Sequence, residues 1–374
     1  MNILFYLPYN QQVVYIESIA EAFANQGEEL YLLTHDEKGI THKNFAKYAV
    51  SVDSMKKPRF RVPLLYHQAR VRQLNKYIRK NNIDIVYSHY QESNFISVFA
   101  QFFVKAKFVI TRHHSDCAYL DSNIKEKIGD FFINKLAKVY ISPSELVYNQ
   151  MVEIEGTKPG KIKKINYGYN FENFKRPDQN QVKKIKVEYD CKFLLIKAAR
   201  FIPEKRHYIL LHVISKLVNE GFDIKLMLLG KGPIREQTEE LVKKLNLVDR
   251  IFFLGYKTNV QDYFSAADLL VHLSLSEASN SAIKEAALTE TPVVVCSNVG
   301  DFSEYIFHQK NGFILEKENP YDALYQLLKE RYTENEENKK LGKQLKQDVM
   351  ERFSIETVFP SYLEINKQLT NGEN

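Results

Sequence analysis

Short apolar runs alternate with stretches of helical spacing through the first half of the chain. The runs that predict strands are Ile3–Leu7, Glu29–Thr34, Ala49–Val52, Ile83–Tyr87, Lys107–Thr111, Val139–Ile141 and Ile162–Tyr167. Between them, apolar residues recur every three or four positions, which predicts helices over Val13–Asn25, Tyr66–Arg79, Phe95–Phe103 and Ile124–Ala137. Short apolar strands separated by helices favour a parallel sheet covered on both faces.

A second alternating series follows a polar stretch, Phe174 to Tyr189, whose Pro177-Asp178 and many charges are typical of a linker. The strands predicted after it are Phe193–Ala198, Ile224–Leu229, Ile251–Leu254, Leu269–Leu273, Val293–Cys296 and Phe313–Leu315. Helices are predicted over Tyr208–Asn219, Ile234–Leu245 and Ser281–Glu290, and residues 320–350 are charged and helical. With 374 residues, the chain is long enough for two such α/β domains in series.

Composition indicates a soluble globular protein, with 44% apolar and 26% charged residues. The three cysteines, Cys117, Cys191 and Cys296, are far apart and outside any metal-type spacing. They favour a reducing compartment without structural disulfides. No basic segment followed by a long apolar core opens the chain, so no signal peptide is expected. No apolar run approaches the ~18 residues needed to span a bilayer.

The net positive charge lies in the first half of the chain. Residues 1–180 carry 25 Lys and Arg against 18 Asp and Glu, whereas residues 181–374 carry 27 against 28. Segment 56–80 contains no acidic residue, and its basic residues are Lys56, Lys57, Arg59, Arg61, Arg70, Arg72, Lys76, Arg79 and Lys80. Interleaved apolar residues suit this segment to an anionic membrane surface or an acidic substrate. A solvated helix face is the alternative, and no nucleic-acid motif accompanies the charge.

The stretch from Leu269 to Cys296 predicts a strand, a loop, a helix and a second strand. Ser279 and Asn280 are favourable N-cap residues, so Glu277 lies in the loop before the helix and Glu285 in its second turn. Free backbone N–H groups and the helix dipole favour an anion at such a helix start. Backbone amides could bind a phosphate and the two carboxylates could bind hydroxyl groups, so such a site would suit a phosphorylated sugar. A capped surface helix with scattered acids is the alternative.

Other polar residues also follow predicted strand ends, where doubly wound sheets bind their ligands. Arg200 and Lys205 follow Phe193–Ala198, and two cations there could neutralise a diphosphate. Gly230-Lys231-Gly232 and Gly255-Tyr256 follow the next two strands, and the glycines allow a tight turn or close backbone approach. In the first half, His113 and His114 follow Lys107–Thr111 and are candidates to face a ligand. Exposed cations, plain turns and structural histidines are the alternatives.

These motifs occur in an order that resembles the retaining GT-B glycosyltransferases of family 4. The matching segments are Ala199-Arg200-Phe201-Ile202-Pro203-Glu204-Lys205, Gly230-Lys231-Gly232-Pro233, Gly255, Ala267-Asp268, Ser276-Glu277 through Glu285-Ala286, Pro292-Val293-Val294, Gly300 through Glu304 and Asn311-Gly312. Two glutamates with seven residues between them are the signature of that family. The segment from Ile165 to Phe171 resembles its end-of-domain motif, and Phe353-Ser354 resembles the start of its C-terminal segment.

The resemblance implies two Rossmann-like doubly wound domains that face each other across a cleft. The implied domains are residues 1–172, with helix 355–374 crossing back, and residues 173–354. The implied reaction retains configuration at the transferred sugar and needs no metal and no cofactor. The nucleotide sugar is a substrate, with UDP favoured over GDP.

The resemblance also implies roles for individual residues. The implied donor-binding residues are Arg200, Lys205, Gly232, Tyr256, Glu277, Asn280, Ser281, Ala282 and Glu285. The implied acceptor-side residues are Asn10, Gln11, His113 and His114. Arg200 and Lys205 would stabilise the leaving diphosphate, Glu277 would contact the sugar near its anomeric carbon, and His113 would lie near sugar and acceptor, which makes these four the implied catalytic residues.

Two departures from the family pattern affect this interpretation. Pro8-Tyr9-Asn10-Gln11-Gln12 replaces the glycine-rich loop of many relatives, and Ala278-Ser279-Asn280 replaces their Gly-Phe-Gly. The leading hypothesis is a glycosyltransferase on the cytoplasmic side that acts on a lipid-linked or surface-polysaccharide acceptor, with segment 56–80 on the membrane. The alternatives are a GT-B nucleotide-sugar epimerase and a catalytically lapsed sugar-nucleotide-binding subunit.

Overall fold

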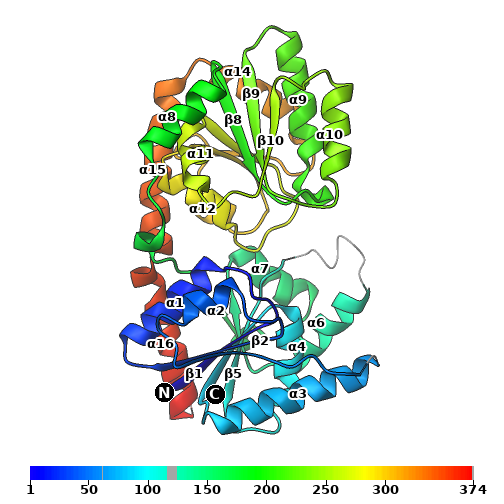
Figure 1. Cartoon of the computed structure of the whole chain (residues 1–374), viewed down its shortest axis with the longest axis vertical. Helices are drawn as coiled ribbons and strands as arrows, with labels where there is room; N and C mark the ends of the chain where they lie inside the picture. Colours follow the sequence, from blue (N-terminus) through cyan, green and yellow to red (C-terminus); the bar gives the residue numbers. More distant parts are fainter. Residues whose placement is uncertain (61, 116–123, 373–374) are drawn as a thin grey trace. The chain divides into compact units, whose positions relative to one another are not determined.

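A computed structural model describes residues 1–60, 62–115 and 124–372 and contains two compact units (Figure 1). Unit 1 comprises Met1–Phe171 together with Phe353–Asn374, and unit 2 comprises Glu172–Arg352. The chain therefore leaves unit 1 after residue 171 and returns to it at residue 353.

Unit 1 is built on a parallel sheet of seven strands in the order β3-β2-β1-β4-β5-β6-β7. Its strands are β1 (Asn2–Leu7), β2 (Glu29–Thr34), β3 (Ser51–Ser54), β4 (Ile85–His89), β5 (Lys107–Thr111), β6 (Val139–Ser142) and β7 (Ile162–Lys164). Its helices are α1 (Val14–Asn25), α2 (Ile40–Phe45), α3 (Pro63–Lys80), α4 (Gln91–Ala100), α6 (Ile124–Leu136), α7 (Glu145–Asn149), η1 (Gln150–Ile154), η2 (Pro159–Lys161), η3 (Phe171–Asn173, at the unit boundary) and α16 (Ile355–Asn371). Helices α1, α2 and α16 form one layer, whereas α3, α4 and α6 form another.

Unit 2 is built on a parallel sheet of six strands in the order β10-β9-β8-β11-β12-β13. Its strands are β8 (Phe193–Ala198), β9 (Ile224–Leu229), β10 (Ile251–Gly255), β11 (Leu269–His272), β12 (Val293–Cys296) and β13 (Phe313–Leu315). Its helices are α8 (Gln179–Glu188), η4 (Pro203–Lys205), α9 (His207–Asn219), α10 (Arg235–Lys244), α11 (Val260–Ala266), α12 (Ser281–Leu288), α13 (Phe302–Tyr305), α14 (Pro320–Arg331) and α15 (Asn335–Phe353). Helix α9 packs with α10 and α14, and α11 packs with α8 and α12. Both units are α/β with a parallel sheet, as the alternating strand and helix patterns of the sequence predict.

The predicted linker over Phe174 to Tyr189 is wrong for most of its length, because helix α8 occupies Gln179–Glu188. Asp178 caps this helix by accepting the N–H of Asn180. Val182 and Ile185 recur at helical spacing and are buried where α8 packs against α11. The high charge of the segment lies on the outward face of an amphipathic helix, which a composition-based interpretation cannot separate from a linker.

Helix α16 completes the core of unit 1, although it is far from the rest of that unit in sequence. The N–H of Tyr169 donates to the carbonyl of Phe353 (2.8 Å), and the N–H of Ile355 donates to the carbonyl of Tyr169 (2.9 Å). The ring of Phe359 packs edge-on against Phe23 of α1 at 4.9 Å. The hydroxyl of Tyr87 in β4 donates to Asn366 Oδ1 in α16 (2.6 Å). The segment thus contributes both apolar and polar contacts to this core.

None of the described helices is long and apolar enough to cross a membrane. Cys191 and Cys296 are free thiols, and Cys117 lies outside the described residues.

Candidate active site

Glu277 lies where polar side chains from two strand ends of unit 2 meet. Its Oε1 atom accepts from Lys205 Nζ (2.5 Å) and from His272 Nε2 at the end of β11 (2.7 Å). Burial alone would raise the pKa of Glu277, but the Lys205 ammonium and the His272 hydrogen bond outweigh it and lower that pKa well below its usual range. Burial lowers the pKa of His272 to about 4, so its neutral ring donates to the carboxylate. Glu277 is therefore an ionised carboxylate at neutral pH.

Lys205 owes its position to the loop that follows β8. This loop forms the single turn η4, whose first residue is Pro203. The Lys205 side chain is buried, and besides Glu277 its ammonium donates to Ser274 Oγ (3.0 Å) and to the carbonyl of Ser276 (3.3 Å). All three acceptors belong to the loop after β11. Lys205 thereby joins the carboxyl ends of two neighbouring strands, as the topology of a doubly wound sheet allows.

Gly230 and Gly232 pack the loop after β9 against the loop after β8. A Cβ atom on Gly230, whose φ is +132°, would lie 2.0 Å from the carbonyl oxygen of Ala199. A Cβ atom on Gly232 would lie 2.3 Å from the carbonyl oxygen of Phe201. The close backbone approach expected at these glycines is thus an approach to the loop that bears Arg200. Arg200 itself is exposed, and Tyr256 after β10 is 66% exposed, so both side chains face solvent.

Glu285 in α12 has surroundings very different from those of Glu277. Burial raises the pKa of Glu285 to about 7, and its described partner is the Nε2 amide of Gln261, at 3.4 Å. Glu285 as a whole residue is half-buried, but its carboxyl group is closely surrounded by other protein atoms. The carboxyl group is thus shared between its protonated and ionised forms near neutral pH. It can donate or accept a hydrogen bond with a hydroxyl group.

The loop before α12 is held by a buried ion pair below it. Lys284 Nζ lies 2.7 Å from Asp301 Oδ2, and both side chains are almost completely buried. Ser279 Oγ donates to the same Asp301 oxygen (2.6 Å), so the serine that departs from the family pattern has a structural partner. Asn280 caps the helix, as predicted, by accepting the N–H of Ile283. Ser281 and Ala282 form the first turn of α12 behind this cap.

Three further buried basic side chains surround this cluster, and the sequence patterns did not single them out. Lys197 in β8 is fully buried, and its ammonium nitrogen has no hydrogen-bond partner among the described residues. Arg206 has φ +49° and donates to the carbonyl of Leu273 (2.6 Å) and to Cys296 Sγ (3.1 Å). His207 stacks on Phe201 with centroids 4.4 Å apart. For Lys197, the sequence did contain a signal, because a charged residue interrupts the apolar run of the predicted strand Phe193–Ala198.

In unit 1, His113 lies within a group of aromatic side chains. Its Nδ1 atom is hydrogen-bonded to the hydroxyls of Tyr15 (2.8 Å) and Tyr167 (2.7 Å), and its Nε2 atom to His89 Nδ1 (3.0 Å). The ring of Tyr90 stacks on it at 4.3 Å, and Tyr90 adopts an uncommon φ of +68°. Burial lowers the pKa of His113 well below its usual value, so the imidazole is neutral at pH 7. Both of its nitrogens have protein partners, so a contact with sugar requires one of them to exchange its partner.

The other acceptor-side candidates have separate surroundings. His114 Nε2 is 3.0 Å from Asp130, a buried carboxylate that also pairs with Arg112 (3.1 Å). Asn10 donates to the carbonyl of Glu37 (2.6 Å), and the Gln11 carbonyl accepts from the hydroxyl of Thr41 (2.5 Å). The loop of residues 8–12, which stands where many relatives have a glycine-rich loop, is therefore hydrogen-bonded to residues near the start of α2.

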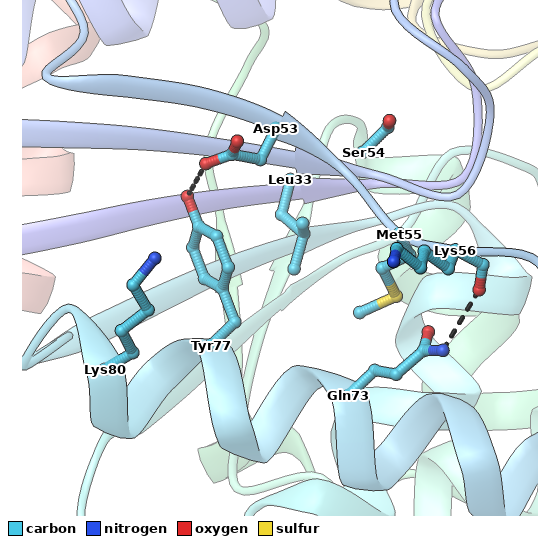
Figure 2. A pocket seen from close by; sticks show the side chains of 8 residues that line it. All are labelled: Leu33, Asp53, Ser54, Met55, Lys56, Gln73, Tyr77 and Lys80. Atoms are coloured by element: carbon cyan, nitrogen blue, oxygen red, sulfur yellow. Dashed lines mark hydrogen bonds between the residues drawn. The ribbon is translucent and has the colours of Figure 1, made fainter.

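A groove of about 290 Å³ lies along the edge of the unit 1 sheet, between β3 and α3 (Figure 2). Its lining residues are Leu33, Asp53, Ser54, Met55, Lys56, Gln73, Tyr77 and Lys80. Figure 2 shows the Tyr77 hydroxyl donating to Asp53, and the amide of Gln73 donating to the Lys56 carbonyl. The groove has both polar and apolar lining, and none of its lining residues belongs to the group around His113.

Among residues 1–60, 62–115 and 124–372, no three of the side chains of His, Cys, Asp and Glu are placed to hold a metal ion.

The two parallel α/β units have the architecture of the GT-B class, and a buried Lys–Glu–His cluster lies at the strand ends of the second unit. The model of the family described as "Glycosyltransferase Family 4" matches residues 12–173, and that of "Glycosyl transferases group 1" matches residues 178–348. The chain belongs to the family 4 glycosyltransferases and is an enzyme of that class.

Curated relatives agree with this family, and a solved structure shares the fold. N-acetyl-alpha-D-glucosaminyl L-malate synthase of Bacillus anthracis is 28% identical over 79% of this chain and 78% of its own length. The N-acetylgalactosamine-N,N'-diacetylbacillosaminyl-diphospho-undecaprenol 4-alpha-N-acetylgalactosaminyltransferase of Campylobacter jejuni is 24% identical over 68% of each. The structure of Anabaena Alr3699/HepE in complex with UDP-glucose has a TM-score of 0.84 at 18% identity, covering 98% of this chain and all of the other.

Proposed function

We propose that this glycosyltransferase transfers a sugar from a UDP-sugar to a lipid-linked or cell-surface glycan acceptor, with retention of configuration and without a metal ion. The observation that carries the proposal is the ionised Glu277, held between Lys205 and His272 at the carboxyl ends of β8 and β11. The UDP-glucose complex of the Anabaena structure supports UDP over GDP. The lipid diphosphate acceptor in the name of the Campylobacter relative supports the acceptor class.

The donor site of the proposal uses residues of unit 2. Lys205 and the exposed Arg200 meet the negative charge of the diphosphate, and this charge increases on the leaving group in the transition state. The start of α12, at Ser281 and Ala282, offers N–H groups and the positive end of the helix dipole to a phosphate. Glu285 hydrogen-bonds the ribose hydroxyls, and Tyr256 and Gly232 border the nucleotide.

Glu277 accepts hydrogen bonds from the donor sugar and keeps a negative charge near the anomeric carbon. An oxocarbenium-like centre is stabilised there because Glu277 stays ionised. The proton of the acceptor hydroxyl passes to the leaving phosphate. His113, as a neutral imidazole among tyrosine hydroxyls, orients hydroxyl groups of the acceptor side together with His114, Asn10 and Gln11.

A transfer assay with purified chain tests this function. UDP-, GDP- and other nucleotide sugars are first ranked by thermal shift, where ligand at a hundredfold of its dissociation constant stabilises by ~2.7 kcal/mol. Nucleotide release is then measured with and without a lipid diphosphate acceptor, and with L-malate, the acceptor in the name of the Bacillus relative. We expect release that depends on the lipid-linked acceptor and is unchanged by EDTA, with an anomeric centre of unchanged configuration in the product.

Variants of the same assay connect the reaction to this site. Glu277→Gln and Arg200→Ala should each lower the rate by about a hundredfold or more, whereas Lys243→Ala, an exposed cation at the end of α10, should not. Release without acceptor would indicate an epimerase or hydrolase, and absence of turnover with tight donor binding would indicate a lapsed subunit. Inversion of configuration, loss of rate in EDTA or use of L-malate would contradict the corresponding part of the proposal.

The acceptor class also motivates a membrane-facing surface on unit 1, in a chain that we expect on the cytoplasmic side. Lys56, Lys57 and Arg59 are exposed beside exposed apolar side chains at the start of α3, which are Phe60 (51%), Val62 (55%), Leu64 (66%) and Leu65 (41%). Cations beside exposed apolar side chains suit an anionic bilayer surface. Arg70 does not belong to this surface, because it is 2% exposed and donates to the Tyr66 hydroxyl, and Arg61 lies outside the described residues.

Vesicle binding tests this surface. Lys57→Gln with Arg59→Gln should weaken sedimentation with vesicles containing anionic lipid by about thirtyfold, since each of the two cations near such a surface contributes ~1 kcal/mol. Lys243→Gln with Lys244→Gln in α10 is the matched control and should leave binding unchanged. Equal binding to neutral and anionic vesicles, or equal loss in both double variants, would exclude this surface.

A further inference from the structure

Lys197 is an unusual residue for its position in the fold. It lies in β8, a central strand of the unit 2 sheet, where β9 and β11 pair on either side. Its exposed area is 0%, and its ammonium nitrogen is buried without a hydrogen-bond partner among the described residues. Burying an unpaired charge is unfavourable by several kcal/mol, so such a lysine is neutral unless an anion is near.

The charged and titratable groups that interact with Lys197 come from several elements at the strand ends. They are Lys205 of η4, Arg206 and His207 at the start of α9, Glu277 in the loop after β11, and Cys296 of β12. His272 of β11 faces the same region, since the charge of Lys197 acts on it. This interior therefore contains several basic groups, and Glu277 is a carboxylate whose charge acts on Lys197.

The carboxylate that acts on Lys197 is already matched by another cation. Glu277 pairs with Lys205 and His272, and Arg206 donates to two carbonyls and to the Cys296 sulfur, which are neutral acceptors. Among the described residues, the Lys197 ammonium therefore has no hydrogen-bond partner, and Glu277 is already paired with Lys205 and His272. A ligand with negative charge would supply one.

We propose that Lys197 is a further donor-binding residue, which is a neutral amine in the free protein and becomes an ammonium when the diphosphate of the donor binds. The donor is then taken up together with a proton from solvent, and Lys197 adds positive charge below Lys205 only when the anion is present. The inference rests on the proposed function for the identity of the anion.

The energetics of the cluster agree with such a change. Burial, followed by repulsion from Lys205, lowers the pKa of Lys197 to about 7 in the free protein. Two negative charges in the same poorly solvated interior favour the protonated form and raise that pKa. Affinity for the donor should therefore weaken by up to about tenfold for each pH unit above about 7.5, until the pKa of the bound state is reached.

The first measurement is the titration of Lys197 in the free chain. Lysine labelled with ¹³C at Cε is followed by NMR from pH 6 to 11, and Lys197→Met assigns the signal. We expect one lysine with a midpoint near 7, which moves to the ammonium position when UDP-glucose is added at pH 8. A Lys197 midpoint near 10 in the free chain would overturn the proposal, whether or not UDP-glucose binds.

The second measurement counts protons during binding. Calorimetry of UDP-glucose binding at pH 8, in buffers of different ionisation enthalpy, gives the net proton uptake. UDP-glucose is a suitable probe because its diphosphate diester does not titrate in this range. Glu285 also titrates near neutral pH, so the diagnostic quantity is the difference between the unchanged chain and Lys197→Met. We expect this difference to approach about one proton per site.

Controls separate this role from a structural one. Lys225→Met on the neighbouring strand β9 removes a lysine that donates to the Asp190 carbonyl (2.8 Å), and it should leave the proton count unchanged. Equal proton counts in the unchanged chain and Lys197→Met would overturn the inference. If UDP-glucose failed to bind the unchanged chain, the proposed donor would be contradicted, and the NMR midpoint would still test Lys197. If Lys197→Met failed to fold, the response of the lysine signal in the unchanged chain to UDP-glucose would be the test.

Discussion

At the scale of the residue, Glu277 and Glu285 illustrate how tertiary surroundings separate two similar side chains. Only seven residues lie between them. Glu277 accepts hydrogen bonds from a lysine and a histidine, which lower its pKa well below the usual range, whereas burial raises the pKa of Glu285 to about 7. Carboxyl groups with pKa values moved in opposite directions are suited to different roles in one site.

The pKa of Glu285 predicts how stability depends on pH. Its folded pKa lies above the value of about 4.5 for an unfolded glutamate, so the folded state holds a proton that the unfolded state has lost between these values. Its contribution to stability is therefore present below pH 4.5 and decreases as pH rises to about 7. Since the side chain is only half-buried, Glu285→Gln should stabilise the chain at pH 8 by about 1–3 kcal/mol and have little effect at pH 4.5.

Urea denaturation at both pH values measures this difference. Glutamine resembles protonated glutamate and cannot ionise, so the substitution should raise the unfolding free energy only where Glu285 is ionised. An equal gain at pH 4.5 and pH 8 would therefore contradict a titrating Glu285.

At the scale of the element, the loops after β8 and β9 position each other. The N–H of Phe201 donates to the carbonyl of Lys231 (3.0 Å), and the N–H of Ile234 donates to the carbonyl of Phe201 (3.1 Å). Gly230 and Gly232 allow this contact because neither has a Cβ atom. The geometry of the loop that bears Arg200 and Lys205 thus depends on a glycine turn in a different segment.

Gly230→Ala should therefore affect the donor site as well as stability. The added methyl group would lie 2.0 Å from the Ala199 carbonyl oxygen, which forces the two loops apart. We expect a loss of about 2–4 kcal/mol in unfolding free energy and weaker donor binding. Thermal unfolding and the donor thermal shift measure the two effects.

Gly221→Ala is the matched control for backbone strain. Gly221 also has a positive φ of +90°, but its added Cβ would meet nothing within 4 Å. It should cost only about 1 kcal/mol, from the left-handed backbone, and leave donor binding unchanged. Equal losses in the two variants would exclude the loop contact as the cause.

At the scale of the whole molecule, the chain builds unit 1 from both of its ends. Helix α16 buries Phe359, Tyr362, Ile365 and Leu369 in unit 1, although about 180 residues of unit 2 precede it. The two units are therefore not separated by one cut in the sequence.

A chain that ends at Arg352 should show this dependence. Unit 1 would lose the apolar contacts of α16 and the hydrogen bond from Tyr87 to Asn366. We expect hydrogen–deuterium exchange to increase by tenfold or more in α1 and β4, because burial of several large side chains is lost. Strands β8 to β13 of unit 2 should keep their protection. Equal protection of α1 in both chains would contradict this role of α16.

Much of the fold could be predicted because it depends on local periodicity. Strands β2, β5, β8, β9, β12 and β13 begin and end as their apolar runs predict. Buried parallel strands are continuous apolar runs, and this signal needs no knowledge of distant residues. The prediction was wrong at α8, where charge concealed an amphipathic helix, and β3 (Ser51–Ser54) lies two residues later than predicted. At that half-exposed edge strand the apolar signal is weak.

The sequence by itself determined the two α/β units, the family and the candidate donor residues. These depend on the order of motifs and on polar residues that follow apolar runs, and both can be seen along the chain without knowledge of tertiary contacts. Only the tertiary structure showed that Glu277 is paired with Lys205 and His272 and that Arg70 is buried. It also showed that Lys197 has no hydrogen-bond partner among the residues that the structure describes. Hydrogen-bond partners and burial depend on side chains brought together from distant segments. The charge states on which the chemistry depends were therefore not accessible from the order of residues alone.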